Sequence, residues 1–294
     1  MTEDEAGSTG EFGKTLGEHY DHLTKSEKRI ANYLRRSQDE VAFLSAGEVA
    51  DRLGLSEATV VRFARTLGFA SYPAMRAVLQ ENFRRRVTHS VRLRGRLDEF
   101  REAGDILERL VVSEIDYLTQ ALETVDRQAL RQVVELLRAH ERIFIFGAGP
   151  SVSLVELMTI RLSRFGRQIV PLTSTGREII EPLLSMTAKD VLFIICFFDL
   201  TPALQVTLDR AREVGCPVVL LTDTLGSVIG DKADLVLAAR RGPVAEFHSL
   251  VVPMTIINAL LLAVASEGGD HVLATLDQLD QLRERLKEAN RQTI

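Results

Sequence analysis

Four side chains that suit DNA recognition recur at helical spacing in one short stretch of the chain. Ser56, Thr59, Arg62 and Arg65 share one face of the helix predicted to follow Ser56. An Arg side chain binds guanine O6 and N7 or a phosphate, and Thr contacts a base edge or a thymine methyl group. Ser56 also suits the N-cap, where its oxygen accepts a hydrogen bond from a free backbone amide.

The opposite face of this helix is apolar, and a second short helix is predicted before it. Val49, Ala50 and Leu53 form the apolar face of that earlier helix, and Gly54 suits its left-handed end. The apolar residues of the later helix are Val60, Phe63, Ala64 and Leu67. Two such helices around a tight turn are typical of a helix-turn-helix, whose second helix enters the major groove. A helical hairpin with a merely solvated polar face is the alternative.

The charge distribution favours DNA binding over the plain hairpin. The 294 residues carry a net charge of −5, which alone argues against a nucleic-acid partner. Residues 24–96, however, hold 15 Lys and Arg against 7 Asp and Glu, a balance of +8. The remainder holds 21 against 34, a balance of −13. The basic charge is therefore concentrated around the predicted helix-turn-helix.

Composition and length indicate a cytoplasmic chain of about two domains. Cys196 and Cys216 lie in or beside apolar runs and do not make a disulfide framework. The N-terminus has neither the basic start nor the apolar stretch of a signal peptide. The most apolar segment, 250–265, contains Pro253 and Asn258 and is too short to span a bilayer comfortably. We therefore expect no membrane partner.

Segment composition predicts the boundaries of the two domains. Thr24 and Glu27 have the spacing of a capping box, which marks the start of the first helix of the helical domain. A run of arginines separates this domain from a second one, and a charged helix with regularly spaced leucines ends the chain. The predicted parts are a disordered lead (1–20), a helix-turn-helix domain (21–83), a linker (84–104), a second domain (105–270) and a terminal helix (271–294).

The second domain alternates five apolar strands with amphipathic helices. The strands are predicted at 142–147, 168–172, 190–197, 217–222 and 233–238. Continuous apolar strands of this kind are typical of a parallel sheet that helices cover on both faces. We predict an α/β fold with an open, doubly wound sheet in the flavodoxin-like order 2-1-3-4-5, beside an all-α N-terminal domain. Its ligand would lie beyond the carboxyl ends of strands one and three.

These motifs together resemble a known family of bacterial regulators. Leu23-Thr-Lys-Ser-Glu-Lys-Arg-Ile-Ala, the stretch from Ser56 to Phe69, and Ser71-Tyr72 look like the RpiR family. The α/β half resembles the SIS (sugar isomerase) domain, with Gly147-Ala-Gly-Pro-Ser151 in its first loop. The resemblance implies a transcriptional regulator that binds DNA and whose SIS domain senses a sugar-derived or related metabolite and dimerises. The residues assigned to the DNA face are Ser56, Glu57, Thr59, Arg62, Arg65, Ser71, Tyr72 and Arg76. For Arg76 and for residues 84–86, backbone contacts or plain solvated charge are the expected roles.

The resemblance also implies a phosphosugar site made of three loops. Glycines in the first loop let a ligand approach the backbone, and hydroxyls in the loops after the first two strands suit an anion. Thr222, with Asp223 beside it, ends the fourth strand at the rim of the site, or closes a turn. The candidate ligand residues are Gly147, Gly149, Ser151, Thr173, Ser174, Thr175, Asp199, Thr201, Thr222 and Glu246.

The loop after the third strand departs from the family pattern Ser-x-Ser-Gly-x-Thr. Only Thr201 remains of its hydroxyls, and Asp199 puts a carboxylate where a phosphate needs donors. Three alternatives remain open for the site: an effector without phosphate, a phosphate held by other loops while Asp199 points away, or a vestigial site. Asp199 is equally a plain helix-start residue. Glu246 matches a region that supplies a base in SIS isomerases, but a helix-start carboxylate is favoured.

Two functions of other classes compete with the regulator. A sugar-phosphate isomerase with an accessory helical domain needs a base and a phosphate cradle, which the sequence does not supply convincingly. An interaction module without DNA leaves the basic patch unexplained. No Cys/His spacing resembles a metal site, and the Gly-x-Gly lacks the rest of a dinucleotide fingerprint, so we expect no cofactor and no catalysis. The expected partners are a pseudo-palindromic DNA operator, a small effector and further copies in a homodimer or homotetramer.

Overall fold

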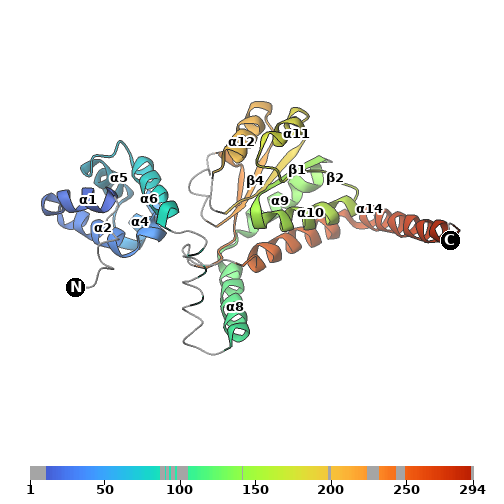
Figure 1. The fold of residues 1–294 in the computed structure, drawn as a ribbon, viewed down its shortest axis with the longest axis horizontal. Coiled ribbons are helices and arrows are strands. Elements are labelled where there is room, and N and C mark those ends of the chain that lie inside the picture. The colour runs from blue at the N-terminus through green and yellow to red at the C-terminus, as the bar shows by residue number, and fades with distance from the viewer. Residues whose placement is uncertain are drawn as a thin grey trace. The chain divides into compact units, whose positions relative to one another are not determined.

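The structure is a computed structural model and describes residues 11–86, 90, 93, 97, 105–140, 142–197, 200–223, 232–242 and 249–292. The chain divides into two compact units, and the boundary between them falls within helix α8 (Ile106–Thr124). Figure 1 shows a helical unit and an α/β unit.

The helical unit contains the predicted helix-turn-helix. Its elements are α1 (Glu11–His19), η2 (Tyr20–His22), α2 (Lys25–Arg36), α3 (Gln38–Val41), α4 (Ala46–Leu53), α5 (Glu57–Thr66) and α6 (Tyr72–Arg86). The predicted capping box is confirmed, because the Thr24 side chain accepts from the Glu27 amide while Glu27 accepts from the Thr24 amide. Ser45 and Glu48 form a second capping box at the start of α4. The α4 helix ends at Gly54, whose φ of 58° is the expected left-handed one.

The predicted disordered lead extends too far into the chain. Residues 11–19 form helix α1, and its Phe12 and Leu16 are only 2% and 1% exposed in the core of the helical unit. The Phe12 ring stacks on Phe69, with 6.1 Å between ring centroids. The two apolar side chains are four residues apart, so they share one helix face. Residues 1–10 lie outside the described residues.

The α/β unit has the predicted doubly wound sheet. Its strands are β1 (Arg142–Gly147), β2 (Gln168–Leu172), β3 (Val191–Ile195), β4 (Val218–Thr222) and β5 (Leu235–Ala238), all parallel, in the order β2-β1-β3-β4-β5. The fold class and the strand order are therefore confirmed. The other elements are α8, α9 (Arg127–Ala139), η3 (Gly149–Ser151), α10 (Val152–Arg164), η4 (Arg177–Ile179), α11 (Ile180–Leu184), α12 (Pro202–Val214) and α14 (Val251–Gln292).

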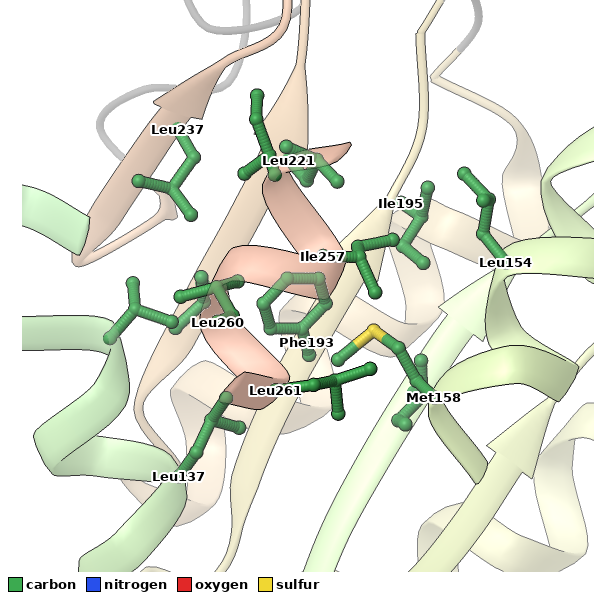
Figure 2. Close-up of a cluster of buried hydrophobic side chains, with 14 of the residues drawn as sticks. Leu137, Leu154, Met158, Phe193, Ile195, Leu221, Leu237, Ile257, Leu260 and Leu261 are labelled. Atoms are coloured by element: carbon green, nitrogen blue, oxygen red, sulfur yellow. The ribbon is translucent and has the colours of Figure 1, made fainter. Parts of the chain in front are cut away.

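The central strand β3 is buried on both faces. Phe193 and Ile195 point into one apolar cluster, and Leu192 and Ile194 point into another. Figure 2 shows Phe193 facing Ile257 of α14, with Met158 of α10 beside it. Alternate side chains of a strand point to opposite faces, so a strand covered on both sides must be apolar throughout.

Helix α14 (Val251–Gln292) consists of two helical parts that meet at a kink, because Gly269 (φ 50°, ψ −131°) breaks the helical geometry. The kink lies close to residue 271, where the terminal helix was predicted to begin. Among the described residues, one helix, Val251–Arg291, is long and apolar enough to cross a membrane by length and composition. Core helices pass the same test, and here Ile257 and Leu260 are buried against the sheet.

An ion pair ties the amino-terminal ends of β1 and β3 together. The Arg142 guanidinium donates to Asp190 through Nε and Nη2, both at 2.7 Å, and Thr187 donates to the same carboxylate from its amide and its hydroxyl. Burial opposes ionisation of Asp190, but these hydrogen bonds outweigh it and lower the pKa of the carboxyl. This pair lies at the edge of the sheet opposite to the predicted ligand site.

Replacing this carboxylate tests its contribution to stability. We expect Asp190→Asn to lower the free energy of unfolding at pH 7 by about 2 kcal/mol, the usual range for hydrogen bonds to a charged group. The pKa of Asp190 is lower in the folded chain, so its stabilisation is present above its unfolded pKa of about 4 and is lost as pH falls through the folded value. Urea unfolding followed by circular dichroism should therefore show a smaller difference between the two proteins at pH 3 than at pH 7.

Asp209→Asn is the matched control for this experiment. The Asp209 carboxylate is exposed and lies 3.5 Å from Lys232, so its loss should change stability little. Equal destabilisation by the two substitutions would contradict the role assigned to the buried pair.

Candidate functional site: a DNA-facing helix and the carboxyl edge of the sheet

Helix α5 is fixed by its buried face and its N-cap. Val60, Phe63 and Ala64 are completely buried, and Leu67 is 2% exposed, as predicted. Ser56 caps the helix, since its Oγ accepts from the Thr59 amide at 3.3 Å. The rotation of α5 about its axis is therefore set by packing, and its polar face is directed away from the core.

Three of the predicted DNA residues are joined on this polar face. Ser56 Oγ and Thr59 Oγ1 share a hydrogen bond of 2.8 Å, and Arg62 Nη2 donates to Thr59 Oγ1 at 3.4 Å. Ser56, Arg62 and Arg65 are exposed, and Thr59 is half-buried. Two guanidinium groups one turn apart, beside two hydroxyls, suit contacts to base edges and phosphates.

The neighbouring helices fix α5 through polar contacts. Thr66 at the end of α5 donates to Glu27 of α2 at 2.8 Å, and Arg29 of α2 donates to the last carbonyl of α4, that of Leu53. Burial opposes ionisation of Glu27, but hydrogen bonds from Thr24 and Thr66 and the nearby Arg62 charge outweigh it and lower its pKa. The Glu27 carboxylate is thus ionised and lies beside Thr66 at the carboxyl end of α5.

The structure places the remaining predicted DNA residues differently. Tyr72 is 3% exposed and its hydroxyl donates to the Leu44 carbonyl at 3.0 Å, so its ring belongs to the core and is unavailable to DNA. Ser71 caps α6, because its Oγ accepts from the Ala74 amide. Arg76 is half-buried, and burial lowers its pKa. Glu57 is exposed, but its carboxylate lies beside Gly47 at the start of α4.

In the α/β unit, the first predicted ligand loop is shaped by close packing. A Cβ on Gly147 would lie 2.6 Å from Val155 Cγ2, so only glycine lets α10 approach the end of β1 this closely. Gly149 has a φ of 57°, a left-handed conformation, with open space around its Cα. Ser151 precedes α10 and is 6% exposed, but its side chain makes no capping hydrogen bond to the helix.

The other described ligand candidates also follow strand ends. Thr173, Ser174 and Thr175 are exposed after β2. Thr201 caps α12, since its Oγ1 accepts from the Leu204 amide at 3.2 Å. Thr222 ends β4 and is 1% exposed, so its hydroxyl lies inside the unit. All these residues stand at the carboxyl edge of one parallel sheet, where ligands of doubly wound folds bind.

Two predicted ligand residues lie outside the described residues: Asp199 and Glu246. Their roles stay predictions. Cys196 and Cys216 form no disulfide in the structure, and the Cys216 thiol donates to the Asp190 carbonyl. Within the ranges that the structure describes, no group of three or more His, Cys, Asp or Glu side chains is arranged to hold a metal ion.

The sequence did not point to a buried ion pair at this same edge. Arg241, three residues past β5, donates to Asp223 at the end of β4 through Nε at 2.9 Å, and its guanidinium lies 3.7 Å from the centroid of the Phe197 ring. The two charged side chains are 5% and 8% exposed. Through these contacts, the pair connects the segments that follow β3, β4 and β5. The sequence feature that could have indicated this pair is the two adjacent arginines, Arg240 and Arg241, shortly after an apolar strand. The sequence does not tell which of the two side chains is buried.

Removing the carboxylate of this pair should destabilise the α/β unit strongly. Asp223→Ala removes the buried carboxylate that Arg241 Nε binds at 2.9 Å, and we expect a loss of about 3–5 kcal/mol in the free energy of unfolding. The double variant Asp223→Leu/Arg241→Met removes both charges and should recover most of this loss. Urea unfolding of the full chain measures both.

Glu213→Ala is the control for a pair without burial. Its partner Arg210 lies 3.5 Å away on the same turn of α12 and Glu213 is exposed, so little change is expected. If the double variant is as unstable as Asp223→Ala, the buried Arg241 charge is not the cause of the lost stability.

Two family models match separate parts of the chain. One is described as the helix-turn-helix domain of the rpiR family and matches residues 11–86. The other is described as the SIS domain and matches residues 135–263. The first range includes helix α1, and the second runs from α9 into the first half of α14.

Relatives of known sequence cover most of the chain. An uncharacterised HTH-type transcriptional regulator of Haemophilus influenzae is 29% identical over 230 residues, which are 78% of this chain and 80% of the relative. The HTH-type transcriptional regulator HexR of Escherichia coli is 25% identical over 279 residues, 92% of each chain.

Solved structures share the fold. The NanR protein of Vibrio vulnificus, solved in complex with ManNAc-6P, has a TM-score of 0.62 and 22% identity, and the match covers 92% of this chain and 98% of that one. The sugar isomerase domain of an RpiR transcription factor from Sphaerobacter thermophilus has a TM-score of 0.57 and 24% identity, over 60% of this chain and 99% of that one.

Proposed function

Because the chain belongs to the RpiR family of helix-turn-helix transcriptional regulators with a SIS domain, we propose that α5 reads an operator while the SIS domain binds a sugar-derived effector. The observation that carries the proposal is the polar face of α5. Arg62 and Arg65 are exposed there, while the opposite face of the helix is completely buried. The protein would act in the cytoplasm on double-stranded DNA, without membrane or cofactor.

We infer that Arg62 contacts a base and that the surrounding basic residues contact phosphates. Arg62 is held by Thr59, which is itself held by Ser56 at the start of the helix. Such support reduces the side-chain freedom that is lost on binding. The balance of +8 over residues 24–96 supplies the phosphate attraction and predicts a steep decrease of affinity with salt.

Arg62→Ala should weaken specific DNA binding about 5- to 150-fold, the range of about 1–3 kcal/mol for a bidentate base contact. The probe is a duplex that the native protein selects from a random-sequence pool, and the readout is fluorescence anisotropy at two salt concentrations. Binding to unrelated DNA should change much less, because that binding depends on total charge.

Arg131→Ala on α9 is the control, since it removes an exposed arginine outside the helix-turn-helix. Equal loss of specific and unrelated binding in Arg62→Ala would assign this residue to the phosphate backbone. Unchanged binding would refute the DNA-facing role of the exposed face of α5.

For the effector, we propose the carboxyl edge of the sheet as the binding site. Support comes from the glycine-rich turn after β1, the exposed hydroxyls of residues 173–175 and the position of these groups at the switch point between β1 and β3. The NanR relative was solved with a sugar phosphate, and that class of ligand is therefore included among the candidates. We propose a binding site without turnover.

Thermal unfolding of the full chain against sugars, phosphosugars and sugar acids tests this site. A true effector at 100 times its dissociation constant should add about 2.7 kcal/mol of stability. Thr173→Ala and Thr175→Ala should reduce that shift, while Thr119→Ala on α8 should not. If no compound of the panel raises the midpoint, the sensing role fails; turnover of a phosphosugar would instead favour an isomerase.

We further propose that the protein binds DNA as a dimer, since helix-turn-helix regulators usually meet pseudo-palindromic operators in this form. An effector that binds more tightly to one placement of the two DNA-binding domains would make that placement more populated. That placement either fits the half-site spacing of the operator or does not. Regulation then requires different effector affinities for the two placements.

A further inference from the structure

The last part of α14 carries exposed leucines beyond the kink at Gly269. Leu273, Leu282 and Leu286 are 60%, 59% and 63% exposed, and every residue from 280 to 291 is exposed. Figure 1 shows this part of the helix extending past the other elements of the α/β unit. We call residues 270–292 the terminal segment. Most helical stability in proteins comes from packing of an apolar face, so such a segment gains stability from a partner.

The start of the terminal segment is held by the α/β unit. Arg138 of α9 binds Glu267 twice, through the carboxylate at 2.7 Å and the backbone carbonyl at 3.0 Å, just before the kink. Val272 is 4% exposed, and His271 and Thr275 lie next to Gly166 after α10. The segment therefore leaves the unit in a fixed direction, and its free part begins near Leu276.

The leucines of the free part follow one helix face. Leu276, Leu279, Leu282 and Leu286 are spaced by three, three and four residues, which places them along one side of a helix. This is the spacing of a short helix–helix seam. Asp280 with Arg283 and Glu284 with Lys287 form ion pairs along the same helix.

Charge is distributed unevenly along the terminal segment. Residues 270–281 contain three Asp and no Lys or Arg, a charge of −3. Residues 282–292 contain four Lys and Arg against two Glu, a charge of +2. Two such helices side by side in parallel would bring like charges together, whereas an antiparallel pair brings the acidic half of each to the basic half of the other.

We propose that the terminal segment binds the same segment of a second copy as an antiparallel helix pair. A two-fold axis near residue 281 makes such a contact self-complementary, as homodimer interfaces are. It places Leu276 opposite Leu286 and directs Asp280, at the edge of the leucine seam, toward Arg283 of the other copy. The inference deepens the proposed dimer and rests on the proposed function only in that respect, because the pairing needs neither DNA nor effector.

Self-association of the full chain without DNA tests the leucine seam. Leu282→Glu/Leu286→Glu should raise the dissociation constant measured by sedimentation equilibrium at least tenfold. The control Ala274→Glu/Gln281→Glu adds the same charge on the opposite helix face and should change it less than twofold. Thermal unfolding verifies that each variant is folded. Equal effects of the two variants, or none, would overturn the proposal.

Charge reversal tests the orientation of the pair. Asp280→Lys puts a positive charge opposite Arg283 of the other copy and should weaken association severalfold. Adding Arg283→Asp in the same chain restores opposite charges between antiparallel partners and should restore association. Failure of this rescue refutes the antiparallel arrangement. Loss of DNA binding in Arg62→Ala would leave these results unchanged, so the two proposals fail independently.

Discussion

Burial of the parallel sheet on both faces is the constraint that determines where the α/β unit can bind a ligand. All residues of β3 and β4 are buried, and their alternate side chains contribute to two separate apolar clusters. Helices cover both faces, so polar groups are found mainly at the two ends of the strands. At the amino end they are used for stability, in the Arg142–Asp190 pair. The carboxyl end carries the glycine turn, the hydroxyl residues and the Arg241–Asp223 pair.

In the helical unit, the corresponding constraint is the rotation of α5. Phe63 is completely buried at the centre of the core, and the Thr59 amide at the start of the helix donates to Ser56. A rotation by one residue would bring Arg62 or Ala64 to the position of Phe63 and cost much of the apolar contact. The core of this unit thus decides which side chains of α5 form its exposed polar face, even though the core residues themselves are buried.

Much of this arrangement could be predicted because it depends on local patterns. The five strands, the capping box at Thr24, the left-handed Gly54 and the buried face of α5 all follow from spacing and turn chemistry. Tyr72 was misassigned because its motif position says nothing about burial; its hydroxyl finds the Leu44 carbonyl, which is distant in sequence. Helix α1 was not predicted because most of its residues are polar or Gly, and only two apolar side chains, Phe12 and Leu16, bind it to the core.

The Arg241–Asp223 pair shows why long-range charge pairs escape sequence reasoning. Arg240 and Arg241 are chemically identical, yet Arg240 is exposed and Arg241 is buried against Phe197. They differ in exposure because successive side chains after β5 point in different directions, and only the tertiary structure specifies which direction leads into the core. Loss of one partner of a buried ion pair is costly, and this makes the edge sensitive to substitution of Asp223 or Arg241.

The cores of the two units also limit how an effector signal can reach DNA. Among the described residues, the apolar cluster of the helical unit contains only residues from 12 to 83, and the clusters of the α/β unit begin at residue 117. In the proposed regulation, a ligand at the carboxyl edge would leave the core that orients α5 unchanged. The coupling free energy would then come from the relative placement of the units or of the copies. A rigid helical unit that is moved as a whole would keep the proposed base contacts and change only their match to the second half-site.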